Sequence, residues 1–551
     1  MSQLSGVRWV CWVLLTGVGI SATTAWGAKP GSEETAREVD RLLAEEVFQP
    51  DTKLAPHVDD AAFLRRVWLD LVGDIPTPEH ITAYVLDPAA DKRAKVVDEL
   101  LANPQYGQNW ARYWRDVVLA RKIEDRAMIV ANPLVTKLTD SFNENKSWAK
   151  IATEFITATG NVRENGATAI ELAQDGRTEE TTAEVSRIFL GIQIQCAQCH
   201  DHKTDRWKRE QFHEFAAFFP RVAVRPIQSP VERSFEVISD DRPDLGRKLP
   251  ADAQGRRGRG EHYMPDLQDP TAEGTKMQPK YFLTSAKLPF GSTDAERRGM
   301  AAKVITHSPW FATAFVNRIW GELVGEGFYE GIDDIGPDRA PSAPKTVELL
   351  SRGFVASGYD VKWLFRTICA TEAYQRESRP RREVTGTPFV ATVAQPLRSD
   401  QLFNAILTAL DLSEPESQVN RRGKPAEMKA AYGSNATARA GFEVAFGYDP
   451  SDPRETVNAS IPQALAMMNG VRINVAVRAV KNDTMLGRLL ANTKDNSAVV
   501  DELYLRTLSR EPTEKERGAA LEFCKDATNR SAVFEDLLWA LVNSSEFSHR
   551  R

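Results

Sequence analysis

The residues best suited to chemistry gather in one segment of the sequence, CAQCHDHKTDRW, which runs from Cys196 to Trp207. The 551-residue chain has five cysteines and eight histidines, and this segment contains two of each. Cys196, Cys199 and His200 have the C-x-x-C-H spacing of c-type haem attachment, in which two thiols bond to the haem vinyl groups and the histidine binds the iron. The spacing therefore predicts a covalently attached haem c, with thioethers at both cysteines and His200 as the proximal iron ligand.

The distal side of such an iron takes a second ligand from elsewhere in the chain or stays open. His202 is too close to His200 to reach the opposite face of the ring. His213, in the helix expected to follow, and Met264, in a later loop, are the candidates for this position. Taken singly, His213 is more simply explained as a histidine on a helix surface, and Met264 as an ordinary methionine in a loop.

The same cluster supports two other interpretations. In an oxidising compartment, Cys196 and Cys199 form a redox dithiol, or a structural disulfide that ties the helix end to the turn. Alternatively, the two cysteines with His200 and His202 offer four ligands of the types that zinc prefers. Ligands this close in sequence rarely all face one ion, so haem c remains the first hypothesis and zinc the last.

A second group of reactive side chains lies in the glycine- and proline-bounded loop YEGIDDIGPDRAPS, residues 329–342. Paired carboxylates can act as acid and base on glycosides or bind a cation, which gives a weaker hypothesis, a hydrolase. A solvated loop with helix-capping aspartates explains the four carboxylates more simply; they are Glu330, Asp333, Asp334 and Asp338. Since the sequence contains no G-x-S-x-G, P-loop, H-E-x-x-H or dinucleotide-binding fingerprint, no catalytic residue is assigned.

Residues 1–27 are typical of a secretory signal peptide. Arg8 precedes an uncharged, mostly apolar run from Trp9 to Ile20, and small residues follow. That run is too short to cross a bilayer, which needs about 20 apolar residues, and no other stretch is long and apolar enough. We therefore expect an exported protein, periplasmic or extracellular, with no membrane span in its mature chain. Export also suits haem c, because that haem is attached outside the cytoplasm.

Composition narrows the class of protein further. Hydrophobic residues make up 42% of the chain, which is enough for buried cores. The formal net charge of -6 is spread along the sequence, so we expect no nucleic-acid partner. Four cysteines follow the signal peptide, too few for a disulfide scaffold, so the fold must depend on its core.

Apolar residues recur three and four positions apart along most of the chain, which predicts a mostly α-helical protein. One such stripe leads directly into Cys196 and consists of Val185, Ile188, Phe189 and Ile192. Another follows the cluster and consists of Phe212, Phe215, Ala216 and Phe219. The cluster is therefore expected in a connection between two helices, where the phenylalanines either shield a haem edge or close the core.

The helical pattern is interrupted once, which predicts two multi-helical domains. We expect an N-terminal helical domain over residues 34–222, an irregular connecting segment over 223–292 and a C-terminal helical domain over 293–550. In the connecting segment, KYFLT (280–284) has the composition of a strand, and the glycine-rich, charged stretch 249–266 is typical of a loop.

Short polar turns mark several of the expected helix boundaries. The sequences LLANPQYGQNWARYW (100–114) and VITHSPWFATAFVNRIW (304–320) each place a proline at the start of a new helix. LDLVGDIPTPE (69–79) and LRTLSREPTEKE (505–516) each place Pro-Thr between two helices, where the threonine suits capping.

Long motifs spread over nearly the whole mature chain resemble a known family. FLRRVWLDLVGDIPTPE (63–79), NPQYGQNWARYWRD (103–116) and the cysteine segment resemble the first of two paired domains of unknown function in secreted planctomycete proteins, DUF1549. FVNRIWGELVGEGFYEGIDDIGPDRAPS (315–342) and IPQALAMMNG (461–470) resemble the second, DUF1553. The first domain is associated with planctomycete cytochromes, but only about a dozen residues separate the signal from the first helical segment, so no separate cytochrome domain is expected.

The resemblance gives no catalytic residues to carry over, so the function is held as two hypotheses. The first is an exported redox or electron-transfer protein with one haem c, whose partner is another redox protein. The second is an extracytoplasmic binding or structural protein in a polysaccharide-processing context, whose partner is an extracellular polymer and whose cysteine pair is a disulfide or metal clamp.

Overall fold

Helices make up most of the protein over the residues that the computed structural model describes. These residues are 29–228, 233–241, 260–269, 271–384, 386–413, 435–452, 454, 463, 466–468, 470–525 and 528–551. The predicted signal peptide lies outside them. The prediction of a mostly α protein with minor β content is confirmed.

Nine described helices precede the cysteine cluster and account for most of the described residues in that part of the chain. They are α1 (Ser32–Glu46), α2 (Asp60–Val72), α3 (Pro78–Leu86), α4 (Lys92–Ala102), α5 (Pro104–Leu119), α6 (Ala131–Asn143), α7 (Trp148–Ile156), α8 (Ala169–Ala173) and α9 (Thr178–Leu190). Short 3-10 helices occur at η1 (Asp125–Val130), η2 (Gly166–Thr168), η3 (Gln195–Gln198) and η5 (Arg381–Glu383).

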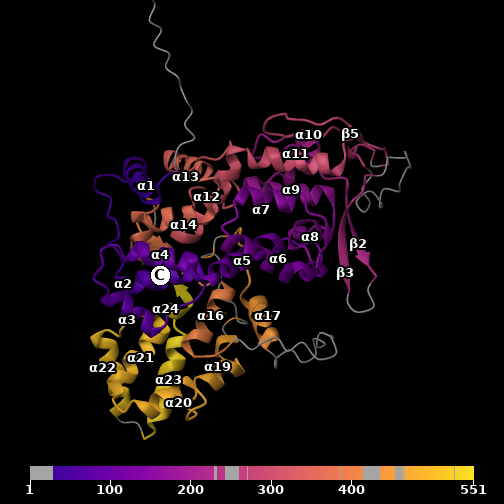
Figure 1. The fold of residues 1–551 in the computed structure, drawn as a ribbon. Coiled ribbons are helices and arrows are strands. Elements are labelled where there is room, and N and C mark those ends of the chain that lie inside the picture. The colour runs from indigo at the N-terminus through magenta and orange to yellow at the C-terminus, as the bar shows by residue number, and fades with distance from the viewer. Residues whose placement is uncertain are drawn as a thin grey trace, which may run out of the picture.

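The helices described after the cluster begin with α10 and end near the last residue. They are α10 (Arg209–Ala216), α11 (Asp294–Thr306), α12 (Pro309–Val324), α13 (Pro344–Ala356), α14 (Val361–Cys369), α15 (Glu372–Gln375), α16 (Ser399–Ala409), α17 (Asn435–Phe446), α19 (Val471–Ala476), α20 (Met485–Asn492), α21 (Asn496–Leu508), α22 (Glu514–Lys525), α23 (Arg530–Val542) and α24 (Ser545–Ser548). Figure 1 shows α20 to α23 grouped on one side of the molecule, with α9, α10 and α11 on the opposite side.

The described strands are short and form small sheets. They are β1 (Gly160–Asn161), β2 (Val222–Ile227), β3 (Ser234–Ser239), β4 (His262–Met264), β5 (Thr275–Met277), β6 (Ser378–Arg379), β7 (Thr392–Val393), β8 (Gln395–Pro396) and β9 (His549–Arg550). The largest sheet has the order β1-β3-β2, is antiparallel and pairs Val224 with Val237. β4 pairs with β5, and β8 pairs with β9 from the other end of the chain.

The strand expected at KYFLT was wrongly placed. Lys280 makes only an isolated bridge with Lys287, and residues 281–284 form a turn. Tyr281 and Phe282 are buried against Phe215, so their aromatic character serves packing rather than strand pairing. Most of the loop predicted over 249–266 lies outside the described residues, and its described end contains β4.

The helix boundaries predicted from the polar turns are confirmed. α5 and α12 each begin at a proline, after Asn103 and Ser308 respectively. Thr77 caps α3 by accepting a hydrogen bond from the N–H of His80, and Thr513 precedes α22. Proline at the first helical position costs no hydrogen bond, because that N–H has no partner within the helix.

Two hydrophobic cores combine residues from both sides of the connecting segment. The larger core runs from Val39 in α1 to Phe389 and holds a cluster of aromatic rings, in which Trp114 of α5 stacks on Phe315 of α12 with centroids 5.7 Å apart. The second core joins α16, α19 and later helices to Leu69 and Ile75 from the region of α2. Each of these two cores therefore contains residues from both predicted domains, the N-terminal one and the C-terminal one.

Helix α2 also fixes the last residues of the chain through buried polar contacts. Arg65 donates hydrogen bonds to the carbonyl oxygens of Thr507 and Phe547, at 2.8 and 3.1 Å. Asp70 accepts two hydrogen bonds from Arg550, at 2.6 and 2.8 Å. These contacts hold the C-terminal helices against the N-terminal ones.

No helix within the described ranges combines the length and apolar character needed to cross a membrane.

Candidate functional site

The cysteine cluster begins where α9 ends. The stripe Val185, Ile188, Phe189 and Ile192 is buried, as predicted, and Gly191 ends the helix with a left-handed φ of 63°. A side chain at this glycine would lie 2.8 Å from Ile335, whose N–H donates to the Gly191 carbonyl oxygen at 2.8 Å. The close approach requires glycine here, and it fixes the direction in which the chain enters the turn.

The turn presents its reactive side chains to solvent. Cys196 on η3 and Cys199 directly after it are exposed free thiols, and His200 is exposed beside them. Ala197 lies between the cysteines, is 0% exposed and belongs to the larger core. The prediction that the cluster lies between two helices is confirmed, because η3 connects α9 to α10.

His200 is held by the backbone in a way that leaves one ring nitrogen available. Its Nδ1 lies 2.8 Å from the carbonyl oxygen of Asp201. A carbonyl oxygen can only accept, so Nδ1 carries the proton and Nε2 has a free lone pair. This is the arrangement by which proteins orient a metal-binding histidine.

His213 of α10 lies beneath the turn and supports its backbone. The ring is 1% exposed, which differs from a surface histidine. Its Nε2 is 3.0 Å from the carbonyl oxygen of Gln198, which directly precedes Cys199, and its Nδ1 is 2.8 Å from Nε2 of His262. Both nitrogens of His213 are therefore engaged, and it faces the inner side of the turn.

The contacts define the protons on this pair of histidines. The Gln198 carbonyl oxygen accepts a hydrogen bond from Nε2 of His213, so this nitrogen carries the proton of the neutral ring. The Nδ1 of His213 must therefore accept a hydrogen bond from Nε2 of His262. The two rings stack with centroids 5.1 Å apart. Burial, together with the neighbouring His262, lowers the pKa of His213 to about 4, and burial lowers the pKa of His262 to about 3. Both rings are therefore neutral at pH 7.

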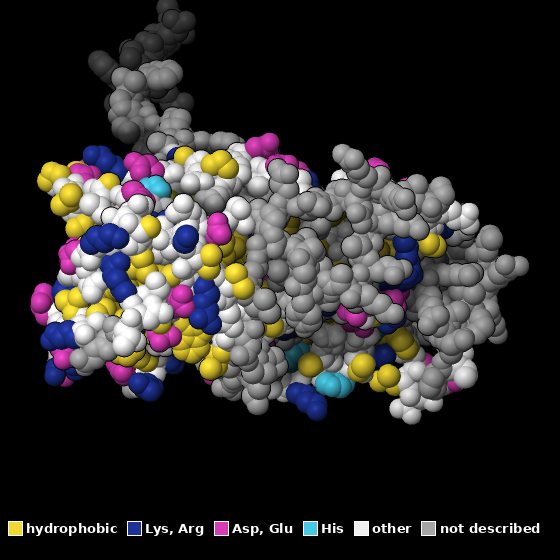
Figure 2. Space-filling model, turned by 90° about the horizontal axis from the view of Figure 1, so that it is seen from below, with side chains coloured by type: hydrophobic (Ala, Val, Ile, Leu, Met, Phe, Trp, Pro, Cys, Tyr) yellow, Lys and Arg dark blue, Asp and Glu magenta, His cyan; other side chains and the backbone are white. Residues whose placement is uncertain are grey.

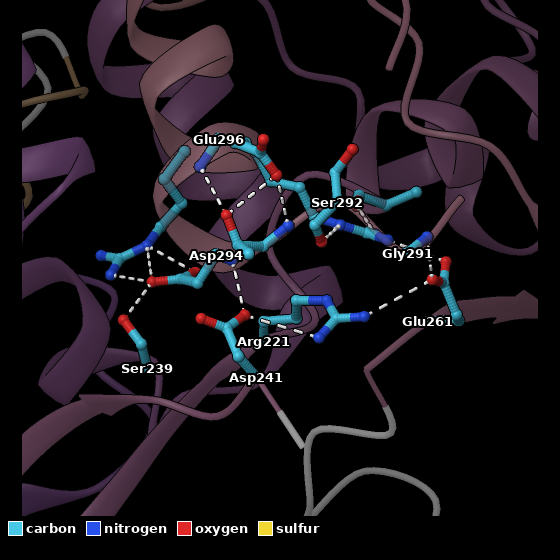
Figure 3. A network of polar contacts seen from close by, with 12 residues as sticks. Arg221, Ser239, Asp241, Glu261, Gly291, Ser292, Asp294 and Glu296 are labelled. Carbon is cyan, nitrogen blue, oxygen red and sulfur yellow. Dashed lines mark hydrogen bonds and ion pairs between the residues drawn. The ribbon is translucent and has the colours of Figure 1, made fainter. Parts of the chain in front are cut away.

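Strand β4, which carries His262, is anchored by the buried polar network in Figure 3. Glu261 accepts hydrogen bonds from Arg297 at 2.8 Å and from the N–H of Gly291 at 2.7 Å, and it pairs with Arg221 at 3.6 Å. Asp241 links Arg221 to the first turn of α11. Since Glu261 directly precedes His262, this network fixes the histidine against α10.

A second set of contacts ties the cluster to the acidic loop at 329–342. The carboxylate of Asp338 accepts three hydrogen bonds from the Arg206 guanidinium, the shortest at 2.7 Å, and one from the Arg206 N–H at 2.9 Å. These hydrogen bonds lower the pKa of Asp338 to about 2. Asp205 pairs with Arg339 at 2.5 Å. The cysteine segment (196–207) and the acidic loop (329–342), which are far apart in the sequence, are therefore in direct contact.

Asp333 of the same loop is buried between two arginines. It pairs with Arg187 of α9 at 2.8 Å and with Arg318 of α12, and it accepts a hydrogen bond from Ser451 at 2.6 Å. Burial alone would raise the pKa of Asp333, but the charges of Arg318 and Arg187 lower it. Asp333 therefore stays charged and joins the loop to α9 and α12. Asp334 pairs with Arg339, and Glu330 is exposed.

The remaining predicted residues are spread around the cluster. His202 accepts a hydrogen bond from the N–H of Asp205 at 3.1 Å and does not join the cysteines. Met264 is half-buried on β4 and, by the alternation of a strand, shares the face of His262. The three phenylalanines of the second stripe are buried in the larger core, so they close the core; they are Phe212, Phe215 and Phe219.

The donors fit covalent haem attachment better than they fit zinc. Two exposed thiols and an imidazole with a free Nε2 lie on one turn, whereas no group of three or more His, Cys, Asp or Glu side chains converges on a metal position within the described ranges. Two cavities of about 1160 and 580 Å³ are lined by residues from Gly321 to Arg551 and by none of the cluster. A haem held at Cys196 and Cys199 would lie on the protein surface.

The supporting residues were not predicted from the sequence. Neither the role of His262 nor the link from Asp338 to Arg206 was expected, since each joins residues far apart in the chain. The one local signal is the position of His262 two residues before Met264, which places both on one face of a strand.

Comparison with known proteins identifies two consecutive domains. Residues 38–224 match the family model PSCyt2, described as a protein of unknown function (DUF1549), and residues 296–524 match PSD1, described as a protein of unknown function (DUF1553). No curated protein and no solved structure matches the chain. The matches confirm the predicted pair in the predicted order, and together they span most of the chain, which thus belongs to the proteins that join a DUF1549 domain to a DUF1553 domain.

Proposed function

We propose that this protein is an exported redox protein that carries one haem c on the surface turn at Cys196, Cys199 and His200. The observation that carries the proposal is the exposure of all three donors on one short turn, with Nδ1 of His200 bonded to a backbone carbonyl. When bound, haem c supplies a one-electron redox centre.

The chain's own residues have distinct tasks in this proposal. The two thiols would hold the group covalently, and Nε2 of His200 would bind its iron. His213 supports the turn from inside by donating to the Gln198 carbonyl oxygen. Because both nitrogens of His213 are engaged, Met264 would be the remaining candidate for a second iron ligand, or that position would stay open.

Surface attachment favours electron exchange with a partner protein. Solvent exposure is one of the factors that set the reduction potential of such a centre. The rim of the turn is highly charged, with Asp201 paired to Lys208 at 2.9 Å and Arg206 paired to Asp338 at 2.7 Å. A redox partner would contact this rim, and association through charged side chains weakens with added salt.

The test is expression in a host with a haem c attachment system. We expect a haemochrome spectrum that survives denaturation and an intact mass equal to the processed chain plus one haem. Cys196→Ser and Cys199→Ser should each weaken attachment, and His200→Ala should change the ligation spectrum while the mass increase remains. The half-buried Cys524→Ser is the matched control and should attach haem normally. A wild-type mass equal to the polypeptide alone in a competent host would overturn the proposal.

Export is part of the proposal and has its own measurement. The N-terminal sequence of protein recovered from the periplasm or medium should begin close to residue 28. Recovery of the uncleaved chain in the cytoplasm alone would contradict it.

A redox dithiol is the second candidate, favoured by the two free, exposed thiols separated by two residues. In that case the haem-free Cys524→Ser protein, which lacks the half-buried thiol, should take up two thiol-reactive groups when reduced and none after oxidation by a disulfide reagent. Cys196→Ser should then leave one exposed thiol that never becomes protected.

A further inference from the structure

A large cavity lies far along the sequence from the cysteine cluster. Its volume is about 1160 Å³, somewhat above the usual range of ligand cavities. Its walls come from the segment around β6 to β8, from α16 and α17, and from α23 to the last residues. Figure 2 shows the molecule from below in the view of Figure 1, and outside the grey atoms its surface mixes hydrophobic side chains with Lys, Arg, Asp and Glu.

The interior of this cavity is mainly apolar. Large apolar side chains line it from several elements, and they include Leu397, Leu402, Phe446, Met467, Met468 and Trp539. Met468 is 48% exposed. Unbranched, polarizable methionines adapt their shape to flexible apolar ligands, which suits an alkyl chain.

Among the residues that the structure describes, the charged side chains lining this cavity are basic. They are Arg381, Arg382, Arg454 and Arg551, with His549 beside them, and this described part of the lining contains no aspartate or glutamate. Arg381 and Arg454 form ion pairs with Glu326 and Glu322, which line the adjoining cavity of about 580 Å³. Their charges are therefore compensated within the protein.

Arg382 differs from these two arginines. Its side chain is 84% exposed, and it approaches the carboxylate of Glu383 only to 4.0 Å, beyond hydrogen-bond distance. An arginine in this position at an apolar cavity presents its donors in the planar geometry that matches a carboxylate. The site thus combines an apolar interior with a basic rim.

We propose that this cavity binds a long-chain carboxylate, with its alkyl chain against the methionines and Trp539 and its carboxylate at Arg382. The charge pattern selects an anion, and the apolar interior selects one with a long hydrocarbon part. This site is independent of the haem proposal, because none of its residues belongs to the cysteine cluster.

The test is isothermal titration of the full chain with dodecanoate, below its aggregation concentration, and with dodecanol as the uncharged match. We expect one dodecanoate per chain, bound more tightly than dodecanol, and no detectable binding of acetate. Arg382→Gln should weaken dodecanoate binding about threefold to fivefold, as expected for an exposed charged contact, and leave dodecanol unchanged. Met468→Ser should weaken the binding of both dodecanoate and dodecanol.

Arg352→Gln on α13 is the matched control, because Arg352 is also highly exposed and does not line the cavity. It should bind dodecanoate as the wild type does. Absence of saturable dodecanoate binding, equal affinity for dodecanoate and dodecanol, or equal affinity in Arg382→Gln and wild type would each overturn the proposal.

Discussion

The turn that carries Cys196 and Cys199 differs sharply between its outer and inner sides. On the outer side, the two thiols and His200 are exposed, and their ion-paired neighbours Arg206 and Asp338 lie near the surface. On the inner side, His213 is buried and neutral and donates to the turn's own backbone.

This difference separates the groups that react from the groups that hold them. Exposed ion pairs contribute little to stability, whereas a buried charge that loses its partner costs several kcal/mol. Substitutions on the outer side should therefore alter chemistry while the fold persists. Substitutions of buried groups such as Asp333 and His213 should lower stability, by an amount that depends on the contacts removed. Three predictions test this division, from the largest expected effect to the smallest.

The largest effect is expected for Asp333→Asn. This change leaves the buried guanidinium groups of Arg187 and Arg318 without their shared carboxylate, although Arg187 keeps Glu184. We expect a loss of about 3 to 5 kcal/mol in the free energy of unfolding, measured by urea denaturation.

Asp338→Asn is the control for that change, because it lies in the same loop and its arginine partner, Arg206, is 57% exposed. Its denaturation midpoint should stay close to that of the wild type. If the two substitutions shift the midpoint equally, the outer and inner sides of the site do not differ in the way described.

The second effect is a dependence of stability on acid that comes from His213. Its pKa is lowered to about 4, so the unfolded chain takes up this proton first as the pH falls below about 6.5. The stability that the neutral ring contributes is therefore complete above pH 6.5 and is lost progressively down to about pH 4. The slope is about 1.4 kcal/mol per pH unit, or about 2 kcal/mol between pH 6.5 and 5.

The surroundings of the pair determine how this effect must be measured. His262, Arg209 and Glu179 act on the charge of His213, and Arg297 acts on that of His262. Elsewhere, burial raises the pKa values of three carboxyl groups, Asp40, Asp116 and Glu171, to between about 6 and 7, and these stabilise the fold as the pH falls. The comparison must therefore be between wild type and His213→Gln, which can still donate but does not titrate. Parallel stability curves from pH 7 to 4.5 would show that His213 is not the group responsible.

Local patterns in the sequence predicted the outer side of the site and most of the helices. The stripe from Val185 to Ile192 predicted α9, and the cysteine spacing located the turn, because helix periodicity and C-x-x-C-H spacing are properties of neighbouring residues. The prediction failed at KYFLT, where the apolar residues of a turn resembled a strand because they are buried by tertiary contacts.

The inner side could not be predicted in the same way. His213 and His262 are 49 residues apart, and Arg187 and Asp333 are 146 residues apart, so no local pattern relates them. The shared cores have the same cause: Leu69 packs with helices after α19 only once the whole chain has folded. Contacts between residues so far apart in the chain depend on the topology of the fold, which cannot be read from local patterns in a single sequence.

The smallest effect is expected for His213→Ala, measured as local opening of the turn. Removing the donor leaves the Gln198 carbonyl oxygen with only the long 3.4 Å contact from Arg209. One such hydrogen bond contributes about 1 kcal/mol, which corresponds to roughly fivefold faster hydrogen exchange in the peptide that contains Cys196 and Cys199. His213→Gln should restore most of the protection, and His307→Ala, an exposed histidine at the end of α11, should change nothing. If exchange in the turn is the same in all three variants, the buried histidine does not support the surface donors, and the two sides of the site act independently.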